Sequence, residues 1–444
     1  EKTDYWISKY FYSKKTDEKL YDKVISCYTE FNLERWTETD RSLKFYREFL
    51  NLKPIPLLKI KRYVAACFIG LNDFFIDKKI DFIVSELLLG MQDAILYEIA
   101  KEKKIKWIGV RNSRLSNGIV FCDPLTEMPL DFPSKSKIYF HSKSKIKPKN
   151  KNLVNKFIKQ RTETKNLPHY MKFTGMKGQY LSIYQLKRLI ETILYSPLIH
   201  NDLKMFVQLN IFNRCKYWLI RASNLYLIRN SSKIKNIFKD ITFLKNKKYV
   251  VFPLQFEPEA TASVRAYPNH NQIEIIEYIS KNLLKEEYLV VKEHKGNEGY
   301  RLIKDYLTIA SLRNVILIEK NSNNLSLLRK SIGVITINST LAVEAYLNDK
   351  PVIILGNSYW MHLKNVKRFK HFSCLTRENF LSFFTTDNKK NLYSQKDTFN
   401  YFYAYSLCVK KGTMLPLAKT TEKEYLGKEN IKYFVKALTD FVMQ

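Results

Sequence analysis

The stretch KYVVFPLQ (248–255) opens the pattern that decides the fold class of this chain. A short apolar run rich in β-branched residues is typical of a buried strand. It is followed by HNQIEIIEYISKNLL (270–284), whose apolar residues recur at the three- and four-residue spacing of a helix that faces a core. This pair predicts the first unit of a parallel sheet with crossover helices.

The same alternation continues as far as residue 355. Further strands are expected at YLVVKEH (288–294), NVILIEK (314–320), GVITIN (333–338) and PVIIL (351–355). Helical patterns separate these strands, at GYRLIKDYLTIA (299–310), NLSLLRKS (324–331) and STLAVEAYLND (339–349). Strands and helices in this order predict a doubly wound, Rossmann-like domain over residues 248–390.

Residues 1–130 show a similar rhythm. RYVAACFIG (62–70) and KWIGVRNSRL (106–115) are expected to form strands. Between them, DFIVSELLLGMQDAILYEIAKEKKI (81–105) predicts a short strand, a turn and a helix. A second Rossmann-like domain is therefore expected. Two such α/β domains that face a cleft resemble the GT-B fold, which is the fold we predict.

Two regions lie outside this pattern. SKSKIYFHSKSKIKPKNKN (134–152) is rich in Lys and indicates a mobile basic segment, and helical patterns follow at 181–196 and 202–228. Residues 131–247 are therefore predicted to form a basic helical insertion. The tail, residues 391–444, is also predicted to be helical and to pack back on the N-terminal domain.

The charge balance of the chain favours acidic partners. Lys and Arg number 75 against 43 Asp and Glu, which leaves a net charge of +32. Such a surplus suits nucleic acid, anionic lipid or phosphorylated substrates. Because the basic residues are spread through the chain and no nucleic-acid-binding motif appears, a nucleic-acid-binding protein is only a remote alternative.

Other features of the sequence bear on the cellular compartment of the protein. The six cysteines lie far apart without a CxxC pair, which favours reduced thiols over disulfides or a zinc site. No apolar run is long enough for a membrane span, and residues 1–12 lack the hydrophobic region of a signal peptide. A cytoplasmic protein is expected.

Polar residues follow the first strand of the 248–390 domain, where a doubly wound sheet binds its ligands. Gln255, Glu257 and Glu259 flank Pro258, which keeps the turn extended. Carboxylates at this place could accept a proton from a hydroxyl group or hydrogen-bond a sugar. A solvated acidic turn without a function is the alternative.

A histidine stands at the end of the next strand. His294 could donate to a phosphate oxygen, Lys292 and Lys295 would add positive charge, and Gly296 would permit close backbone approach. An ordinary surface histidine is the alternative. The sequence favours a phosphate ligand.

The expected strand GVITIN (333–338) is followed by residues that could cap a helix. Asn338, Ser339 or Thr340 would cap the following helix, whose free N–H groups and dipole favour an anion. Glu344 lies one turn further on the same face, where it could meet a ribose hydroxyl. An ordinary N-cap is the alternative, but together with His294 the pattern predicts a nucleotide phosphate site.

Several common motifs are absent. The sequence contains no GxGxxG, P-loop, HExxH or GxSxG motif, so a classical dehydrogenase, P-loop kinase, zincin or α/β-hydrolase is poorly supported. No Asp-x-Asp metal motif is evident either. A reaction without metal or cofactor is expected.

These residues resemble a known family. The segments YVVFPLQFEPEATAS, YLVVKEHKG and GVITINSTLAVEAYLNDKPVIILG resemble the bacterial capsule polysaccharide biosynthesis proteins, which include the β-Kdo transferases. The likeness is clearest over residues 248–357, and SELLLGMQDAILYEIAKEKKIKWIGVRNSR (85–114) resembles the family more faintly. The resemblance implies a GT-B enzyme that uses a CMP-activated ulosonic acid such as CMP-Kdo.

The resemblance also implies roles for individual residues. The family's His-Pro element corresponds to His294 and Lys295, where Lys replaces Pro, and its Ser/Thr-x-x-x-Glu element to Ser339, Thr340 and Glu344. The candidates for the catalytic carboxylate are Glu257, Glu259 and Glu86, which ends the strand FIVSE. Arg111 and Arg114 could pair with a sugar carboxylate or an acceptor phosphate.

The implied partners are a CMP-sugar donor and a glycan or glycolipid acceptor at the anionic inner face of the cytoplasmic membrane. Because Lys295 departs from the family pattern, a UDP- or GDP-sugar or a polyol-phosphate donor is the alternative enzyme hypothesis.

Overall fold

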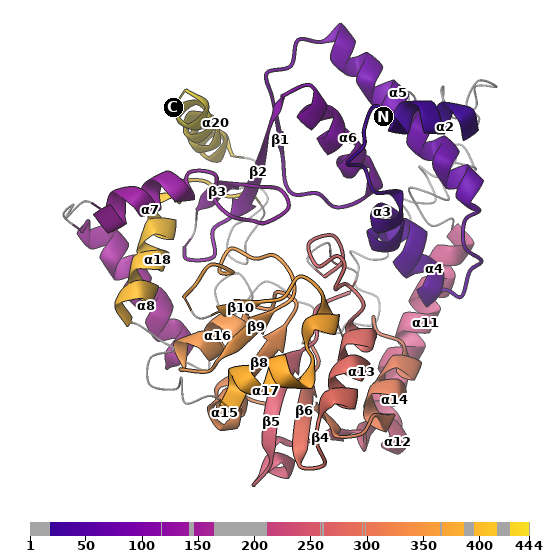
Figure 1. Cartoon of the computed structure of the whole chain (residues 1–444), viewed down its shortest axis with the longest axis vertical. Coiled ribbons are helices and arrows are strands. Elements are labelled where there is room, and N and C mark those ends of the chain that lie inside the picture. The colour runs from indigo at the N-terminus through magenta and orange to yellow at the C-terminus, as the bar shows by residue number, and fades with distance from the viewer. Residues whose placement is uncertain are drawn as a thin grey trace.

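The chain folds around two sheets of unequal size. The computed structural model describes residues 18–116, 118–141, 146–163, 211–257, 259, 262–294, 296–297, 299–364, 366–385, 395–414 and 427–443. Figure 1 shows the small N-terminal sheet, in purple, above the larger C-terminal sheet, in pink to orange.

The large sheet contains seven strands in the order β10-β9-β8-β5-β6-β7-β4, all paired in parallel. They are β4 (Phe238–Lys239), β5 (Lys248–Pro253), β6 (Glu287–Lys292), β7 (Val315–Ile318), β8 (Gly333–Thr336), β9 (Val352–Ile354) and β10 (Val366–Arg368). The strands predicted from residue 248 to residue 355 are confirmed. Because β5 pairs with both β6 and β8, the strand order reverses beside β5, which makes this the topological switch point.

Helices cover both faces of this sheet. The predicted helices are present as α13 (Gln272–Asn282), α14 (Ile303–Ser311), α15 (Asn324–Lys330) and α16 (Leu341–Leu347), and α17 (Arg377–Thr385) follows them. Successive residues of β5, Val250 and Val251, belong to separate apolar clusters, as the alternation of a strand requires. Both faces are therefore buried, and the doubly wound α/β class is confirmed.

The small sheet contains β1 (Phe82–Ser85), β2 (Lys106–Asn112) and β3 (Ile119–Cys122). β1 and β2 run parallel and are joined by α6 (Met91–Glu102), as predicted, whereas β3 is antiparallel to β2. The strand predicted at 62–70 is wrong, because those residues lie inside the helix α5 (Leu57–Asp77). Residues 63–68 are all buried, so this part of α5 has no polar face that could reveal a helical period.

Short helices precede α5. They are α2 (Glu18–Ile25), α3 (Leu33–Thr39), the π-helical turn η1 (Arg41–Phe45) and α4 (Tyr46–Phe49). Asp40 starts η1 by accepting the N–H groups of Ser42 at 2.8 Å and Leu43 at 3.1 Å. Its other oxygen accepts the Met91 N–H at 2.9 Å, which fixes η1 to the N-terminus of α6.

The basic middle region is helical where it is described. It contains α7 (Phe132–His141), α8 (Pro148–Thr162), α11 (Ile211–Asn230), α12 (Ser232–Lys235) and the 3-10 turn η4 (Ile241–Leu244). The mobile segment expected at 134–152 is therefore wrong for α7 and for the start of α8. α11 agrees with the second helical pattern, whereas the pattern at 181–196 lies outside the described residues. β4 joins the large sheet before the predicted domain boundary at residue 248.

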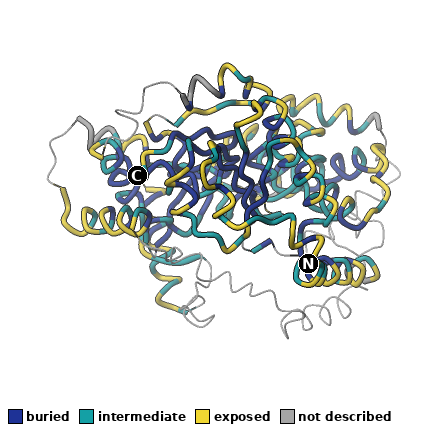
Figure 2. The backbone as a smooth tube through the Cα atoms, turned by 90° about the horizontal axis from the view of Figure 1, so that it is seen from below, coloured by how far each residue is buried: buried dark blue, intermediate teal, exposed yellow. Residues whose placement is uncertain are grey.

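The short turn η5 (Phe372–Cys374) precedes α17, and the tail contains α18 (Gln395–Leu407) and α20 (Lys428–Val442). Ala437 and Phe441 of α20 pack against Ile108 and Phe121 of the small sheet. Across the described residues, no helix combines the length and apolar character needed to span a bilayer. Figure 2 shows the buried chain gathered through the middle of the molecule, with exposed helices around it.

Candidate functional site

The carboxyl edge of the large sheet brings together the three predicted strand ends. Gln255 and Glu257 follow β5, His294 follows β6, and Asn338 to Thr340 follow β8. Because β5 is hydrogen-bonded to both of the other strands, these segments are neighbours at the switch point. This is where a doubly wound sheet binds its ligands.

Glu257 is held in place by two side chains. Gln272, at the start of α13, donates to Glu257 Oε1 at 2.6 Å, and Arg301 donates to Glu257 Oε2 at 2.9 Å. Gln255 is buried, and its backbone N–H donates to Gln272 Oε1 at 2.6 Å. The carboxylate of Glu257 is therefore both oriented and charge-balanced.

A buried ion-pair network lies under this loop, and the sequence reasoning missed it. Arg301 also donates to Glu293 Oε2 at 3.0 Å, and the Tyr306 hydroxyl donates to the same oxygen at 2.8 Å. Burial alone would lower the pKa of Arg301, but Glu257 and Glu293 outweigh it and raise the pKa above its ordinary value. The network ties the loop after β5 to the loop after β6.

His294 directly follows Glu293 of this network and is hydrogen-bonded to it. Its backbone N–H donates to Glu293 Oε1 at 2.6 Å, and its ring Nδ1 accepts the Gly296 N–H at 3.1 Å. The acceptor role of Nδ1 assigns the ring proton to Nε2. Burial lowers the pKa of His294, while Glu293 and Glu259 oppose this shift. The ring is thus a neutral N–H donor at neutral pH.

The loop after β8 forms a compact polar turn. Thr336 Oγ1 accepts the Ser339 N–H at 3.0 Å, and Ser339 Oγ accepts the Leu341 N–H at 3.3 Å. Thr340 is the N-cap residue of α16, but its side chain makes no capping hydrogen bond. Asn338 is buried beside it. The Thr340 hydroxyl is thus not used to cap the helix.

Glu344 has partners in this structure. Arg161 of α8 donates to Glu344 Oε1 at 2.8 Å, and Asn324 donates to Oε2 at 3.2 Å. Lys292, the last residue of β6, donates to Asn324 as well. The predicted contact of Glu344 with a ribose stays a prediction, and it would have to replace or extend these contacts.

Three arginines surround the buried carboxylate of Glu127. Glu127 forms ion pairs with Arg111, Arg114 and Arg265, the second of these at 3.5 Å. Burial, with the nearby Arg114 and Arg265, lowers the pKa of Arg111 to about 9. Burial likewise lowers the pKa of Arg265 to about 10. Glu127 and Arg265 are site residues that the sequence reasoning missed.

The remaining candidates lie beside these arginines or outside the described residues. Glu259 and Glu86 are both close enough to Arg265 to raise its pKa, against the effect of burial. Glu86 directly follows β1, so it belongs to the N-terminal side of the site. Lys295 lies outside the described residues. The structure thus brings Arg111, Arg114 and the two carboxylates together.

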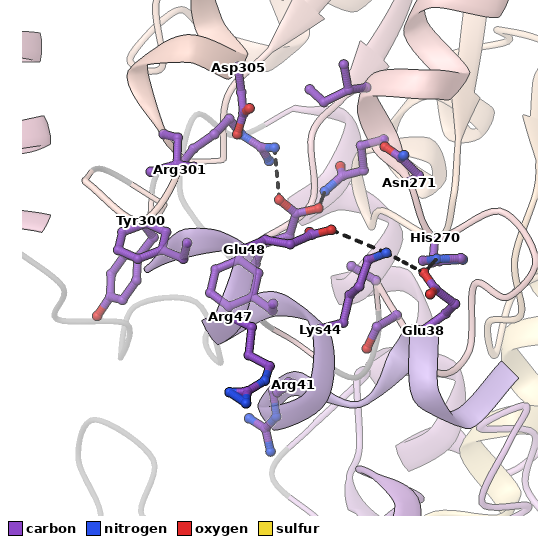
Figure 3. Close-up of a pocket in the computed structure, with 18 of the residues that line it drawn as sticks. Glu38, Arg41, Lys44, Arg47, Glu48, His270, Asn271, Tyr300, Arg301 and Asp305 are labelled. Carbon is purple, nitrogen blue, oxygen red and sulfur yellow. Dashed lines mark hydrogen bonds and ion pairs between the residues drawn. The ribbon is translucent and has the colours of Figure 1, made fainter. Parts of the chain in front are cut away.

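A pocket of about 550 Å³ opens next to Glu257 and Glu259. Its other walls come from η1 and α4, from the start of α13 and from residues 300–305. Figure 3 shows the pocket with Arg301 and Asp305 at one end and Arg41 and Arg47 at the other. A volume of this size suits a sugar-sized ligand.

The helix α11 joins two of these walls. Lys216 donates to the Leu50 carbonyl at 2.6 Å, and Tyr217 packs against Phe49 of α4. On the other side, Asn224 donates to the Arg301 carbonyl at 3.2 Å, and Arg221 lies 3.7 Å over the Tyr300 ring. α11 therefore braces α4 against the loop that holds Arg301.

Taken together, the described residues define an α/β protein with a cluster of polar side chains at the switch point of a doubly wound sheet. Residues 179–363 match the family described as capsule polysaccharide biosynthesis protein. The resemblance predicted from the sequence is therefore confirmed in this region, which contains His294, Glu257 and the β8 loop.

One curated relative shares part of this region. The capsule polysaccharide export protein KpsS of Escherichia coli is 26% identical over 153 residues, which are 32% of this chain. The alignment spans 37% of the length of KpsS, so it covers well under half of that relative.

Distant likenesses to solved structures were also found. Two are structures of Thermosulfurimonas dismutans KpsC, each 10% identical to this chain. The match to the β-Kdo 2,4 transferase covers 73% of this chain and 78% of that chain, with a TM-score of 0.35. The match to the β-Kdo 2,7 transferase covers 87% of this chain and 97% of that chain, with a TM-score of 0.34. A third is the UDP-GlcNAc 2-epimerase of Neisseria meningitidis, 15% identical over 90% of each chain with a TM-score of 0.28. These likenesses are too remote to bear on function.

Proposed function

We propose that this chain is a glycosyltransferase that moves a CMP-activated ulosonic acid, Kdo or a related nonulosonate, onto a bacterial surface polysaccharide or a lipid-linked glycan. The observation that supports the proposal best is the meeting of His294, Glu257 and the β8 loop at the switch point, inside the region that matches the capsule polysaccharide biosynthesis family.

The proposed reaction breaks the bond between the anomeric carbon and the phosphate oxygen of CMP, and the phosphate keeps the electron pair. The Nε2–H of His294 and the hydroxyl groups of Ser339 and Thr340 would donate to that phosphate as its charge develops. An acceptor hydroxyl oxygen forms the new bond to the anomeric carbon and gives its proton to a carboxylate. No step in this scheme requires a metal ion.

The candidate carboxylates differ in their surroundings. Both oxygens of Glu257 are engaged by Gln272 and Arg301, which suits a residue that orients the loop or the sugar. Glu259 is exposed and Glu86 is half-buried, and both lie near Arg265. We therefore favour Glu259 or Glu86 as the base and give Glu257 the positioning role.

The first experiment is calorimetric titration with CMP, CDP, UDP and GDP, without metal and then with magnesium. Selective binding of CMP without metal is the expected result. A preference for UDP or GDP would overturn the CMP donor and favour the alternative donors, for which the Lys at position 295 leaves room. Absence of nucleotide binding would leave the strand-end residues with structural roles alone.

A second experiment measures release of CMP from CMP-Kdo with an acceptor glycan present. Glu259→Gln and Glu86→Gln are compared with Glu257→Gln. We expect one of the first two to lower turnover about 100-fold or more, as loss of a general base does. If Glu257→Gln alone abolishes turnover while it still binds CMP normally, the assignment of roles is reversed.

We also propose that the enzyme works at the cytoplasmic face of the inner membrane, where anionic lipids would attract a chain with a net charge of +32. The charge surplus supports this location, and a nucleic-acid partner is not part of the proposal.

A further inference from the structure

Two arginines in the pocket have no hydrogen-bonded or ion-paired partner among the described residues, although Arg41 lies close enough to Asp40 and Asp93 to oppose the rise that burial causes in the pKa of each. Arg41 belongs to η1 and Arg47 to α4, and both line the pocket. Within the described part of the chain, neither guanidinium group makes a hydrogen bond or an ion pair. Figure 3 shows both side chains extending in the same direction from their helical segment.

Arg47 is partly desolvated in spite of this. Its Nε atom is buried without a hydrogen-bond partner, and burial lowers the pKa of the side chain. Placing a guanidinium group in this way costs free energy unless an anion binds to it. The arrangement is therefore better suited to a bound ligand than to an empty pocket.

The other charges of the pocket compensate one another. Lys44 forms ion pairs with Glu38 at 2.7 Å and with Glu48 at 3.2 Å. Asp40, the carboxylate next to Arg41, already accepts three backbone N–H groups. Glu48 of α4 is thus paired with Lys44, and both oxygens of Asp40 accept backbone N–H groups, so among the described residues neither carboxylate forms an ion pair with Arg41 or Arg47.

The opposite end of the pocket has the opposite character. Glu257 and Glu259 line it together with Asn271 and Gln272 at the start of α13. Carboxylate and amide groups are suitable partners for sugar hydroxyls. The pocket therefore offers hydroxyl-binding groups at the candidate catalytic end, where the Arg301 guanidinium is already paired with Glu257, and guanidinium groups without an ion pair among the described residues at the far end.

We propose that this pocket is the acceptor subsite and that Arg41 and Arg47 bind an anionic group, a carboxylate or a phosphate, of an acidic acceptor. The inference rests on the proposed transferase function and adds the chemical class of the acceptor. Guanidinium groups bind both anions through paired hydrogen bonds. A pocket of about 550 Å³ accommodates one acidic sugar or a glycerol phosphate end, with its hydroxyls toward Glu257 and Glu259.

The test is a site-resolved footprint of the wild-type protein. Arginines are modified with phenylglyoxal, and the rate at each one is read by mass spectrometry. The probes are glucuronate and glycerol 3-phosphate, with glucose and glycerol as neutral controls. We expect either anion to protect Arg41 and Arg47 saturably, and a probe at four times its dissociation constant slows modification about fivefold.

Exposed arginines provide the internal control. Arg313 and Arg329 lie far along the chain and do not line the pocket. Equal protection at these two sites, or no protection of Arg41 and Arg47 by either anion, would overturn the proposal. Protection by glucuronate alone assigns a sugar carboxylate, protection by glycerol 3-phosphate alone a phosphate, and protection by both a general anion site.

A matched pair of variants separates this inference from the proposed function. The double variant Arg41→Gln with Arg47→Gln should lower the affinity for the anionic probe about tenfold or more, because charge-assisted hydrogen bonds are lost. Its affinity for CMP should be unchanged. Arg313→Gln with Arg329→Gln removes the same charge and should change neither. If wild-type protein does not bind CMP, the proposed function fails, whereas the footprint still reports on the anion site.

Discussion

His294 illustrates how one side chain is prepared by its neighbours. Its Nδ1 accepts a backbone N–H from Gly296, which leaves the proton on Nε2. Burial disfavours the charged imidazolium, whereas Glu293 and Glu259 favour it. The ring can then donate one hydrogen bond to a phosphate without first changing its charge.

The titration of His294 is the first prediction. We expect NMR to give a pKa below the ordinary value of 6.5, and Glu259→Gln should lower it further because a carboxylate that favours the imidazolium is lost. Since the folded pKa is depressed, the neutral ring stabilises the fold above the ordinary pKa, and this contribution declines as the pH falls below it. A rise in the His294 pKa in Glu259→Gln would contradict the geometry.

Removal of the imidazole is the second prediction. His294→Ala should lower turnover of the donor about 100-fold, as loss of one preorganised donor at a developing charge does. The melting temperature should stay close to that of the wild type, and His371→Ala, outside the site, should have near-normal turnover. Near-normal turnover in His294→Ala would remove the residue from the phosphate site.

The arginine cluster supports a third prediction. Glu127→Ala leaves Arg111, Arg114 and the buried Arg265 without their shared carboxylate. Removal of one partner from a buried ion pair costs about 3–5 kcal/mol in the free energy of unfolding. Denaturant unfolding measures this cost, and Glu30→Gln in the exposed pair with Lys101 should cost less than about 1 kcal/mol. Equal effects would mean that the cluster is solvated.

Among the secondary-structure elements, α20 has two apolar faces. Ala437 and Phe441 pack on the small sheet, whereas Ile431 and Val435 are 52% and 54% exposed. Lysines of the helix flank the exposed face, at Lys428, Lys432 and Lys436. An exposed apolar stripe bordered by lysines is typical of a helix that lies on an anionic membrane surface.

The fourth prediction concerns this face. Ile431→Ser with Val435→Ser should reduce co-flotation with vesicles that contain anionic phosphatidylglycerol, because apolar area that enters the lipid boundary is lost. Zwitterionic vesicles should bind weakly in every case. The double variant should melt like the wild type, since both side chains are exposed. Unchanged binding to anionic vesicles would show that α20 is not the contact.

The elements themselves show how far the sequence could predict the fold. β5 to β9 and their helices were predictable because each strand is a short apolar run bounded by a helix with a clear period. α5 was not, since it is buried around residues 63–68 and lacks that period. α8 was missed because lysines conceal an apolar row, Val154 and Phe157, that packs on α16 and α18.

The candidate site residues also fall into those that the sequence could predict and those that it could not. Gln255, Glu257, His294 and Ser339 were predictable because each follows a strand end, a position that sequence can locate. Glu127, Arg265 and Arg301 were not, because the pairs of Glu127 with Arg265 and of Glu257 with Arg301 join residues that only tertiary packing brings together. The pairing of Glu344 with Arg161 could not be foreseen for the same reason.

At the scale of the whole molecule, the net charge of +32 gives the fifth prediction. Self-repulsion of like charges destabilises a compact chain, and salt screens it. The melting temperature should therefore rise when sodium chloride is raised from about 20 mM to about 200 mM, over which the screening length falls by roughly a factor of three. A fall would mean that attractive pairs such as the Glu127 cluster dominate.

The position of α11 has a consequence for selectivity. It bonds to the Leu50 carbonyl on one wall of the pocket through Lys216 and to the Arg301 carbonyl on the other through Asn224, so the spacing between these walls is set by the stretch of helix between those two residues. A pocket with a fixed aperture selects by length, because it cannot tighten around a shorter molecule. Under the proposed function, acceptors should accordingly be distinguished by the span between their hydroxyls and their acid group, more than by the identity of the sugar ring.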